Sequence, residues 1–195
     1  MNPDHLAPFT RLLDYSQWAN TALVEAAGEC SDAELDRPLE IGPGSGTLRR
    51  ILSHTCTAEE IWLRRWRQEP SVPWPNEAAP VSLDDLAHRF TAVAGARREF
   101  VTALSPADLA REQTYRDSKG SHFRATLSDM LLQGLVHSIH HRAQAANALR
   151  RLGHPGPDLD FMYHVRQPAY NRARRAFHRP RPPWPLPVRP SPSLP

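Results

Sequence analysis

The sequence predicts an all-α fold: a four-helix bundle with long crossover connections and a Pro/Arg-rich C-terminal extension. Four segments of roughly 20–27 residues repeat apolar side chains at intervals of three and four, which is typical of amphipathic helices. No alternating pattern of strand length competes with these segments. Helices that each carry one apolar face bury those faces by packing against one another, and this predicts the bundle.

The first two predicted helices cover residues 6–27 and 46–68. The first ends at Gly28, and the second follows a Gly/Pro loop in which Ser45 is the candidate N-cap. The apolar face of the first helix is formed by Phe9, Leu12, Leu13, Leu23 and Ala27. The inward face of the second helix is formed by Leu48, Ile51, His54, Ala58, Ile61 and Trp62.

The third predicted helix covers residues 82–104. Ser82 is followed three residues later by Asp85, a spacing typical of a capping box. The helix ends near Ser105 because Pro106 disfavours the helical conformation in the residue before it. Its apolar face is formed by Leu83, Leu86, Phe90, Val93, Phe100 and Leu104.

The fourth predicted helix covers residues 126–152 and ends before Gly153. Thr126 and Asp129 form a second capping-box pattern at its start. Its inward face contains two histidines, because the residues at helical spacing are Met130, Gly134, His137, His141, Ala145, Ala148 and Leu152.

Two connections between the predicted helices are long. Residues 69–81 form a Pro/Trp-rich crossover, and residues 111–125 are expected to be a loop or a small hairpin that turns at Lys119 and Gly120. Crossovers of this kind occur in bundles that are not simply up-and-down.

The C-terminal residues differ in composition from the rest of the chain. Residues 168–195 contain six arginines, nine of the twenty prolines and no acidic residue. Removing those six charges from the net charge of +3 leaves the other residues near −3. We therefore expect a bundle domain over residues 1–167 and an extended or disordered basic tail over residues 168–195.

The composition also limits the location of the protein. No apolar run approaches the ~18–20 residues that span a bilayer, and the N-terminus lacks the pattern of a secretory signal. Cys30 and Cys56 form no metal-binding or disulfide pattern. A cytoplasmic protein without membrane association is expected.

Three histidines on inward faces indicate a metal site. His137 and His141 are one turn apart on the fourth helix, and His54 lies on the inward face of the second. A buried imidazole needs a partner, and a divalent ion is a partner that all three can share. Hydrogen-bonded core histidines are the alternative reading of the same spacing. His140 points about 100° away from the pair, so we expect it to hydrogen-bond nearby rather than bind the ion.

Four stretches of the chain share their pattern with one known family. They are LLDYSQWANTALVEAA at 12–27, ILSHTCTAEEIWLRRW at 51–66, HSIHHRAQ at 137–144 and GHPGPDLDFMYHVR at 153–166. Together they resemble the DinB/YfiT-like metalloenzymes over about residues 6–166, and HSIHHRAQ resembles that family's HxxxHRGQ signature. One departure is Ala143, where the family usually has glycine.

The resemblance implies a four-helix bundle with a three-histidine metal site at the positions of His54, His137 and His141. Zinc or nickel is the expected ion, and three protein ligands leave a coordination position open for catalysis. Several relatives use a low-molecular-weight thiol such as mycothiol or bacillithiol. The leading hypothesis is therefore a metal-dependent thiol S-transferase that acts on an electrophilic small molecule.

Other residues near the predicted site have candidate roles. Arg142 is the candidate catalytic residue, because it could bind a carboxylate of the thiol or of the substrate. A surface or interhelical salt bridge is the alternative role of Arg142. Gln144 and Glu59 are candidates for orienting the ligands.

Three other functions are weighed against thiol transfer. The same histidines suit a hydrolase that activates water, but no inward Asp or Glu stands out as its general base. A non-catalytic, metal-binding stress-response bundle is a second alternative. A nucleic-acid role would rest on the basic tail and Trp184, and the acidic body argues against it. The apolar first helix and the tryptophans Trp62, Trp66 and Trp74 leave surface for a homodimer.

Overall fold

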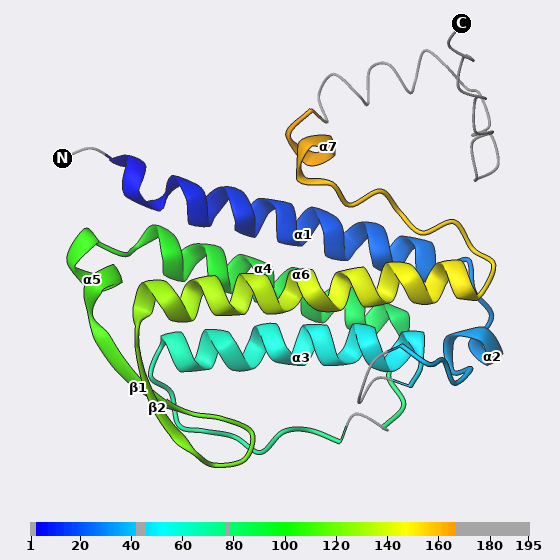
Figure 1. Ribbon diagram of the computed structural model, residues 1–195, viewed down its shortest axis with the longest axis horizontal. Helices are drawn as coiled ribbons and strands as arrows, with labels where there is room; N and C mark the ends of the chain where they lie inside the picture. Colours follow the sequence, from blue (N-terminus) through cyan, green and yellow to red (C-terminus); the bar gives the residue numbers. More distant parts are fainter. Residues whose placement is uncertain (1–2, 42–45, 77–78, 167–195) are drawn as a thin grey trace, which may run out of the picture. The chain divides into compact units, whose positions relative to one another are not determined.

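The structure is a computed structural model that describes residues 3–41, 46–76 and 79–166. The chain divides into two units, Met1–Leu159 and Asp160–Pro195, and each is described by itself. The first unit contains four long helices (Figure 1): α1 (Ala7–Ala27), α3 (Leu48–Trp66), α4 (Leu83–Thr102) and α6 (Leu127–Arg151). Their bounds lie within two residues of those predicted, and the all-α bundle is confirmed.

Side-chain caps define where three of these helices begin. The hydroxyl groups of Ser82 and Thr126 accept hydrogen bonds from the backbone N–H groups of Asp85 and Asp129, as their spacing predicts. α3 is capped by Thr47 rather than by Ser45, which lies outside the described residues. Thr47 lies directly before the first helical residue, so its hydroxyl reaches the third N–H of α3.

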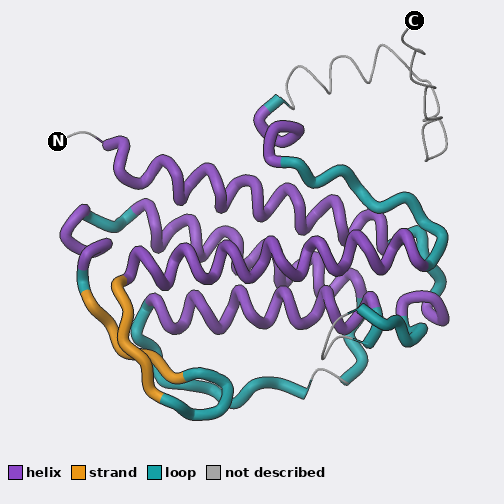
Figure 2. Tube along the Cα trace, in the orientation of Figure 1, coloured by secondary structure: helices purple, strands orange, loops and turns teal. Residues whose placement is uncertain are grey.

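Shorter elements fill the connections (Figure 2). The helices are η1 (Pro3–Leu6), α2 (Asp32–Leu35), α5 (Pro106–Ala110) and, in the second unit, α7 (Phe161–Val165). The predicted hairpin is present as two antiparallel strands, β1 (Glu112–Arg116) and β2 (His122–Thr126). Its turn requires Gly120, whose φ of +86° favours a residue without a Cβ and whose N–H donates to the carbonyl of Asp117.

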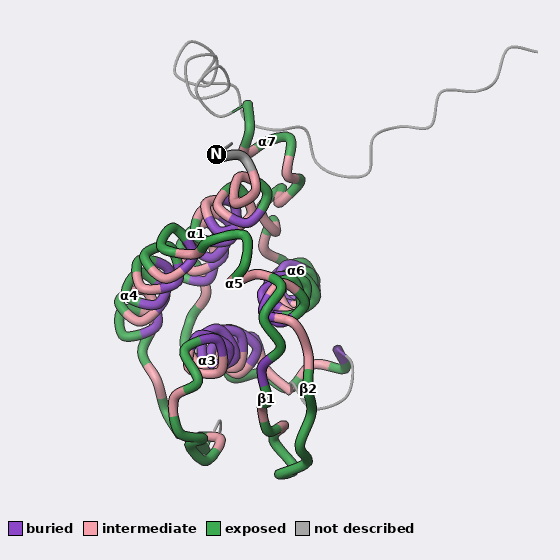
Figure 3. Tube along the Cα trace, turned by 90° about the vertical axis from the view of Figure 1, so that its left-hand side faces the viewer, coloured by how far each residue is buried: buried purple, intermediate pink, exposed green. Residues whose placement is uncertain are grey.

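Each long helix packs against two neighbours in the cyclic order α1, α4, α3, α6, seen end-on in Figure 3. α1 and α6 run in one direction, and α3 and α4 run in the other (Figure 1). Because α3 and α4 are parallel, the chain between them must return along the bundle, and this explains the long crossover of residues 67–82. The antiparallel pair α3 and α6 therefore faces this crossover and the hairpin, as Figure 1 shows.

The bundle core consists of two apolar clusters. One lies around Leu23, Leu48 and Leu149, and the other lies around Leu13, Trp66 and Leu131. Trp62 and Trp66 are buried in the second cluster, so these two tryptophans do not supply the exposed surface that sequence analysis assigned to them. Between the two clusters lies a layer of buried polar residues that includes Asn20, Glu59, Arg97, Ser138 and Arg142.

None of the helices in the described part of the chain is long and apolar enough to cross a membrane. The predicted tail, residues 168–195, and the predicted boundary at Gln167 lie outside the described residues.

Candidate metal centre

The closely packed pair α3 and α6 brings the three predicted ligands together. A Cβ added at Gly134 would lie 2.8 Å from the ring of Trp66, so only glycine allows this approach of the two helices. The indole N–H of Trp66 donates to the carbonyl of Met130 and fixes the register of the pair. One and two turns further along α6, His137 and His141 face His54 of α3, as the helical periodicity predicts.

The imidazoles form a compact group, the histidine cluster. One ring nitrogen from each of His54, His137 and His141 lies within 4.8 Å of the other two. The ring centroid of His141 lies 4.4 Å from those of both His54 and His137, and the rings meet edge to face. All three side chains are half-buried, so the cluster is shielded by the bundle and still reached from solvent.

Gln144 orients one of the three rings. Its side-chain oxygen lies 2.7 Å from Nδ1 of His141. An amide oxygen only accepts hydrogen bonds, so Nδ1 carries the proton and Nε2 keeps its lone pair. A hydrogen bond of this kind fixes the tautomer and orientation of metal-binding histidines in general. This contact supports the role that sequence analysis suggested for Gln144.

The environment favours the neutral imidazole at two of the three positions. Burial, followed by repulsion from neighbouring histidines, lowers the pKa of His137 below its ordinary value of 6.5. The same causes lower the pKa of His141 to about 4. Both rings are therefore uncharged at neutral pH, which is the protonation state that binds a metal.

The donor set fits a divalent transition metal. Nitrogen ligands lie ~2.0–2.1 Å from zinc, which separates two ligands of one tetrahedral ion by roughly 3.4 Å. The nitrogens of the cluster lie within 4.8 Å of one another, so an ion of this size would draw the rings closer together. Three imidazoles on rigid helices are a set that zinc, nickel, copper or iron accepts, and the geometry does not choose between these ions.

Two neighbours of the cluster lie outside it, as predicted from their helical positions. His140 is exposed on α6. Its ring centroid lies 5.0 Å from that of His141, and the two rings meet edge to face. Cys56 is fully buried in an apolar cluster of the core. Burial raises the pKa of its thiol, which keeps the sulfur protonated and unsuited to metal binding.

Arg142 lies in the core rather than at a site open to solvent. Only 2% of the residue is exposed. Its guanidinium donates to the side-chain oxygen of Asn20 on α1 and lies 3.7 Å from the carboxylate of Glu59 on α3. The structure therefore shows the interhelical salt bridge that sequence analysis kept as the alternative for Arg142.

Glu59 is the centre of this second polar group, the charged cluster, which consists of Glu59, Arg97 and Arg142. Arg97 on α4 lies 2.7 Å from the Glu59 carboxylate, and both side chains are 1% exposed. Burial alone would raise the pKa of Glu59, but the two guanidinium groups together lower it. Glu59 is thus an ionised carboxylate enclosed by cations, and it contacts arginines rather than a metal ligand.

Sequence analysis did not single out Arg97. A signal was present, because Arg97 falls at core spacing between Val93 and Phe100 on the apolar face of its helix. A charged residue at such a position requires a buried partner. The partner itself, Glu59, could be found only from the packing of α3 against α4.

A cavity of about 290 Å³ opens between the crossover and the hairpin. Its walls come from α3, from Glu69–Trp74 and from Arg116–Gly120, the two long connections. Trp74 joins this cavity to the histidine cluster, because its ring centroid lies 5.1 Å from that of His54.

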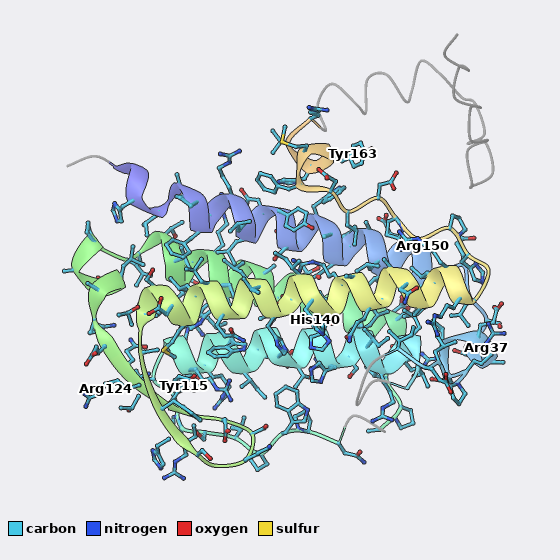
Figure 4. The ribbon with its side chains drawn as sticks, in the orientation of Figure 1. Arg37, Tyr115, Arg124, His140, Arg150 and Tyr163 are labelled. Atoms are coloured by element: carbon cyan, nitrogen blue, oxygen red, sulfur yellow. The ribbon has the colours of Figure 1, made fainter. Side chains whose placement is uncertain are left out.

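Arg65 is the half-buried cation of this cavity. Its guanidinium lies 4.6 Å from the ring centroid of Trp62 and 5.4 Å from that of Tyr115. Tyr115 projects from the hairpin, as Figure 4 shows. Neighbouring Arg64 pairs with Glu69, whereas no carboxylate of the described residues lies within ion-pair distance of Arg65. Two aromatic rings thus hold a guanidinium on which the charge of Asp117, another residue of the cavity wall, also acts favourably.

Comparisons with known proteins identify the family and the fold. The chain matches the family model of the DinB family over residues 1–173. Its fold matches the crystal structure of a DinB-like protein from Bacillus cereus ATCC 10987 with a TM-score of 0.55 and 22% sequence identity. That match covers 72% of this chain and 90% of the other, and at this identity it shows a shared fold alone. No curated protein matches the chain.

Proposed function

The chain belongs to the DinB family, and from this premise we propose that it is a metal-dependent enzyme that transfers a low-molecular-weight thiol to an electrophilic small molecule. The observation that carries the proposal is the convergence of His54, His137 and His141 on one point beside a cavity. A divalent cation held by these three side chains would act as a Lewis acid that lowers the pKa of a thiol.

The side chains around this point serve the reaction in different ways. Gln144 holds the ring of His141 with Nε2 directed away from the hydrogen bond. Trp74 packs beside His54 and limits the access of water to the cluster from the crossover side. In the transfer step a carbon–sulfur bond forms as a carbon–oxygen bond of an epoxide, or a carbon–halogen bond, breaks. The thiol gives up its proton to solvent when it ionises. The epoxide oxygen takes a proton back from solvent, whereas a halide leaves as the anion and the proton stays in solution.

Arg65, rather than Arg142, is the cation suited to bind an anionic group of the thiol. A planar guanidinium that no carboxylate of the described residues contacts at ion-pair distance can present its N–H groups to a carboxylate of the thiol in a paired geometry. Arg65 follows His54 by eleven residues on α3, which corresponds to about 16 Å along the helix. A thiol of about three residues spans only ~10 Å, so the long Arg65 side chain, which leans toward the N-terminal end of α3, would cover the rest of the distance.

A hydrolase is less well supported by the site. Glu59 and Glu60 are the carboxylates of α3 that follow His54 most closely in the sequence. Glu59 is paired with Arg97, and Glu60 is paired with Arg89 at 2.7 Å. A general base must reach water with a free carboxylate, and these two carboxylates are engaged by arginines.

The test combines metal analysis with thermal shift. Purified protein should bind about one zinc or nickel ion per chain. Cysteine, glutathione, mycothiol and bacillithiol are then screened as probes, and at least one should raise the melting temperature of the metal-loaded protein but not of the His141→Ala variant. Transfer to a fluorogenic alkyl halide should require the same thiol.

The outcomes separate the alternatives. If no thiol stabilises the metal-loaded protein, the transferase proposal is wrong. Hydrolysis without a thiol would support the hydrolase, and unfolding on metal removal would support a structural ion. Arg65→Met should weaken thiol binding at least about tenfold, in line with the loss of a charge-assisted hydrogen bond. Arg124→Met, on the exposed face of the hairpin, is the matched control.

A further inference from the structure

One face of α6 is apolar and exposed. Leu132, Val136 and Ile139 are 44%, 58% and 41% exposed, although large aliphatic residues are ordinarily buried. Ala143 is also exposed and continues the same side of the helix. At intervals of four, three and four residues, these four positions form one continuous line, the α6 surface stripe.

The stripe differs from the exposed face of α4, another long helix of the bundle. From residue 130 to residue 149, the exposed side chains of α6 carry no formal charge, and the polar ones among them are Gln133, His140 and Asn147. By contrast, α4 exposes the charged pair Arg98 and Glu99. An uncharged line of aliphatic side chains on the surface is typical of a protein–protein contact.

Charges do occur beyond the two ends of the stripe. Asp129 is exposed in the first turn of α6, and Arg150 and Arg151 are exposed in the last turn. His140, near the middle of the helix, and Arg150, near its end, are labelled in Figure 4. The exposed face of α6 is therefore acidic at one end, apolar in the middle and basic at the other end.

We propose that the α6 surface stripe is the contact between two copies of this chain, packed antiparallel around a two-fold axis midway between Val136 and Ile139. In a two-fold contact, residue i of one copy faces residue j of the second, and j faces i. This register places Val136 opposite Ile139 and Leu132 opposite Ala143, so every member of the stripe meets another member. Pairing the largest side chain with the smallest lets the two helices approach closely at both ends.

The charges support the same arrangement. In this register Asp129 of one copy faces a position four residues before Arg150 of the second copy. The two charged residues are therefore offset by ~6 Å along the helix axis. An extended arginine side chain covers such an offset and can reach the carboxylate. The antiparallel pair therefore brings the acidic end of each helix to the basic end of the other.

A parallel arrangement lacks both kinds of complementarity. Two copies related by an axis along the helices would place Arg150 and Arg151 against the same arginines of the second copy. Ala143 would face Ala143, which leaves a gap at one end of the stripe. The distribution of charge and of side-chain size thus selects the antiparallel pair of identical copies.

The size of the contact sets the expected strength of the dimer. Asp129 and Arg150 are 21 residues apart, about 32 Å along α6. A single helix pair buries less than the ~800 Å² per partner of a standard interface. The dimer should therefore dissociate on the order of micromolar concentration. It depends on the fold of α6 and does not require a bound metal.

Sedimentation velocity of the full chain, with a chelator present, tests the proposal. Across a concentration series that brackets the micromolar range, the mass should rise from the 22.0 kDa of one chain toward twice that value. Val136→Glu places a charge at the centre of the stripe and should give a monomer at every concentration. Thr21→Glu, on the exposed face of α1, should dimerise as the wild type does. Helical circular dichroism should be unchanged in both variants.

Cysteine cross-linking tests the register. Copies carrying Leu132→Cys, mixed with copies carrying Ala143→Cys, should form a disulfide faster than either variant alone. A wild type that stays monomeric, or a Val136→Glu variant that still dimerises, would overturn the proposed contact. Faster cross-linking of each variant with itself would overturn the antiparallel arrangement.

Discussion

Two polar clusters share helices α3 and α6, and they have opposite character, since the charged cluster also includes Arg97 of α4. The histidine cluster is half-buried and uncharged at two positions, and it faces the crossover side of α3 and α6. The charged cluster is almost fully buried, and its carboxylate is enclosed by Arg97, Arg142 and Asn20. His141 and Arg142 are neighbours in the chain, yet one belongs to each cluster.

The difference shows that one bundle can hold a closed group of buried charges beside a partly exposed group of imidazoles. Buried ions are retained only where partners satisfy them, so the charged cluster is closed to any further ligand of its carboxylate. A neutral, partly exposed imidazole needs no counter-ion. One of its ring nitrogens keeps a lone pair that can bind a cation. Substitutions in each cluster and a change of pH test this contrast.

Glu59→Ala should cost about 3–5 kcal/mol of unfolding free energy, because it leaves two buried guanidinium groups without their carboxylate. Urea unfolding followed by circular dichroism measures the loss. Glu60→Ala is the matched control: Glu60 also pairs with an arginine, but both side chains are about one-third exposed, so the cost should stay below ~1 kcal/mol.

A compensating variant sharpens this prediction. Replacing Glu59, Arg97 and Arg142 together by leucine and methionine removes the buried charges as a set. This triple variant should be more stable than Glu59→Ala, because no unpaired ion remains. Equal destabilisation of Glu59→Ala and Glu60→Ala would show that the charged cluster does not behave as a buried ion group.

His137→Ala should weaken metal binding at least ~100-fold while the apo-protein keeps its melting temperature within a few degrees. The reason is that the half-buried ring contributes a ligand and little of the apolar core. His140→Ala is the control and should change metal affinity less than about threefold. Competition with a chromophoric chelator measures both. A larger loss from His140→Ala than from His137→Ala would contradict the assignment of the ligands.

Gln144→Ala should lower metal affinity by about 10–100-fold, because the hydrogen bond that fixes the tautomer of His141 is removed. Stability without metal should hardly change. Gln133→Ala, at an exposed position of the same helix, is the control, and its metal affinity is measured by the same chelator competition. If both variants bind metal as tightly as the wild type, Gln144 does not position the ligand.

The smallest effect concerns pH. The pKa of His141 is about 4 in the folded protein and near 6.5 in the unfolded chain, so the unfolded chain binds more protons between these values. Stability of the metal-free protein should therefore fall as the pH decreases from about 6.5 to about 4. The ring is half-exposed, so we expect the contribution of His141 to stay below about 1 kcal/mol. His141→Gln should show a smaller fall between pH 7 and pH 5, measured by urea unfolding.

Much of the fold follows from local patterns. Apolar spacing and the caps Ser82 and Thr126 predicted the long helices within two residues, because period and capping are properties of short segments. The pairing of His137 with His141 followed from the same periodicity. Only the hairpin was ambiguous as a loop or a pair of strands, since its two short strands carry no clear alternation.

The sequence alone determined which residues share a helical face, and the tertiary structure decided what each face meets. Arg142 was the candidate for binding a carboxylate of the thiol or of the substrate, and the packing of α1 and α3 against α6 buried it beside Glu59. Leu132, Val136 and Ile139 lie off the inward face that periodicity predicted for this helix, and no helix of the first unit covers them in the described structure. Periodicity fixes angles around one helix axis, whereas burial depends on the distance and rotation of neighbouring helices. These are set only when the whole bundle packs.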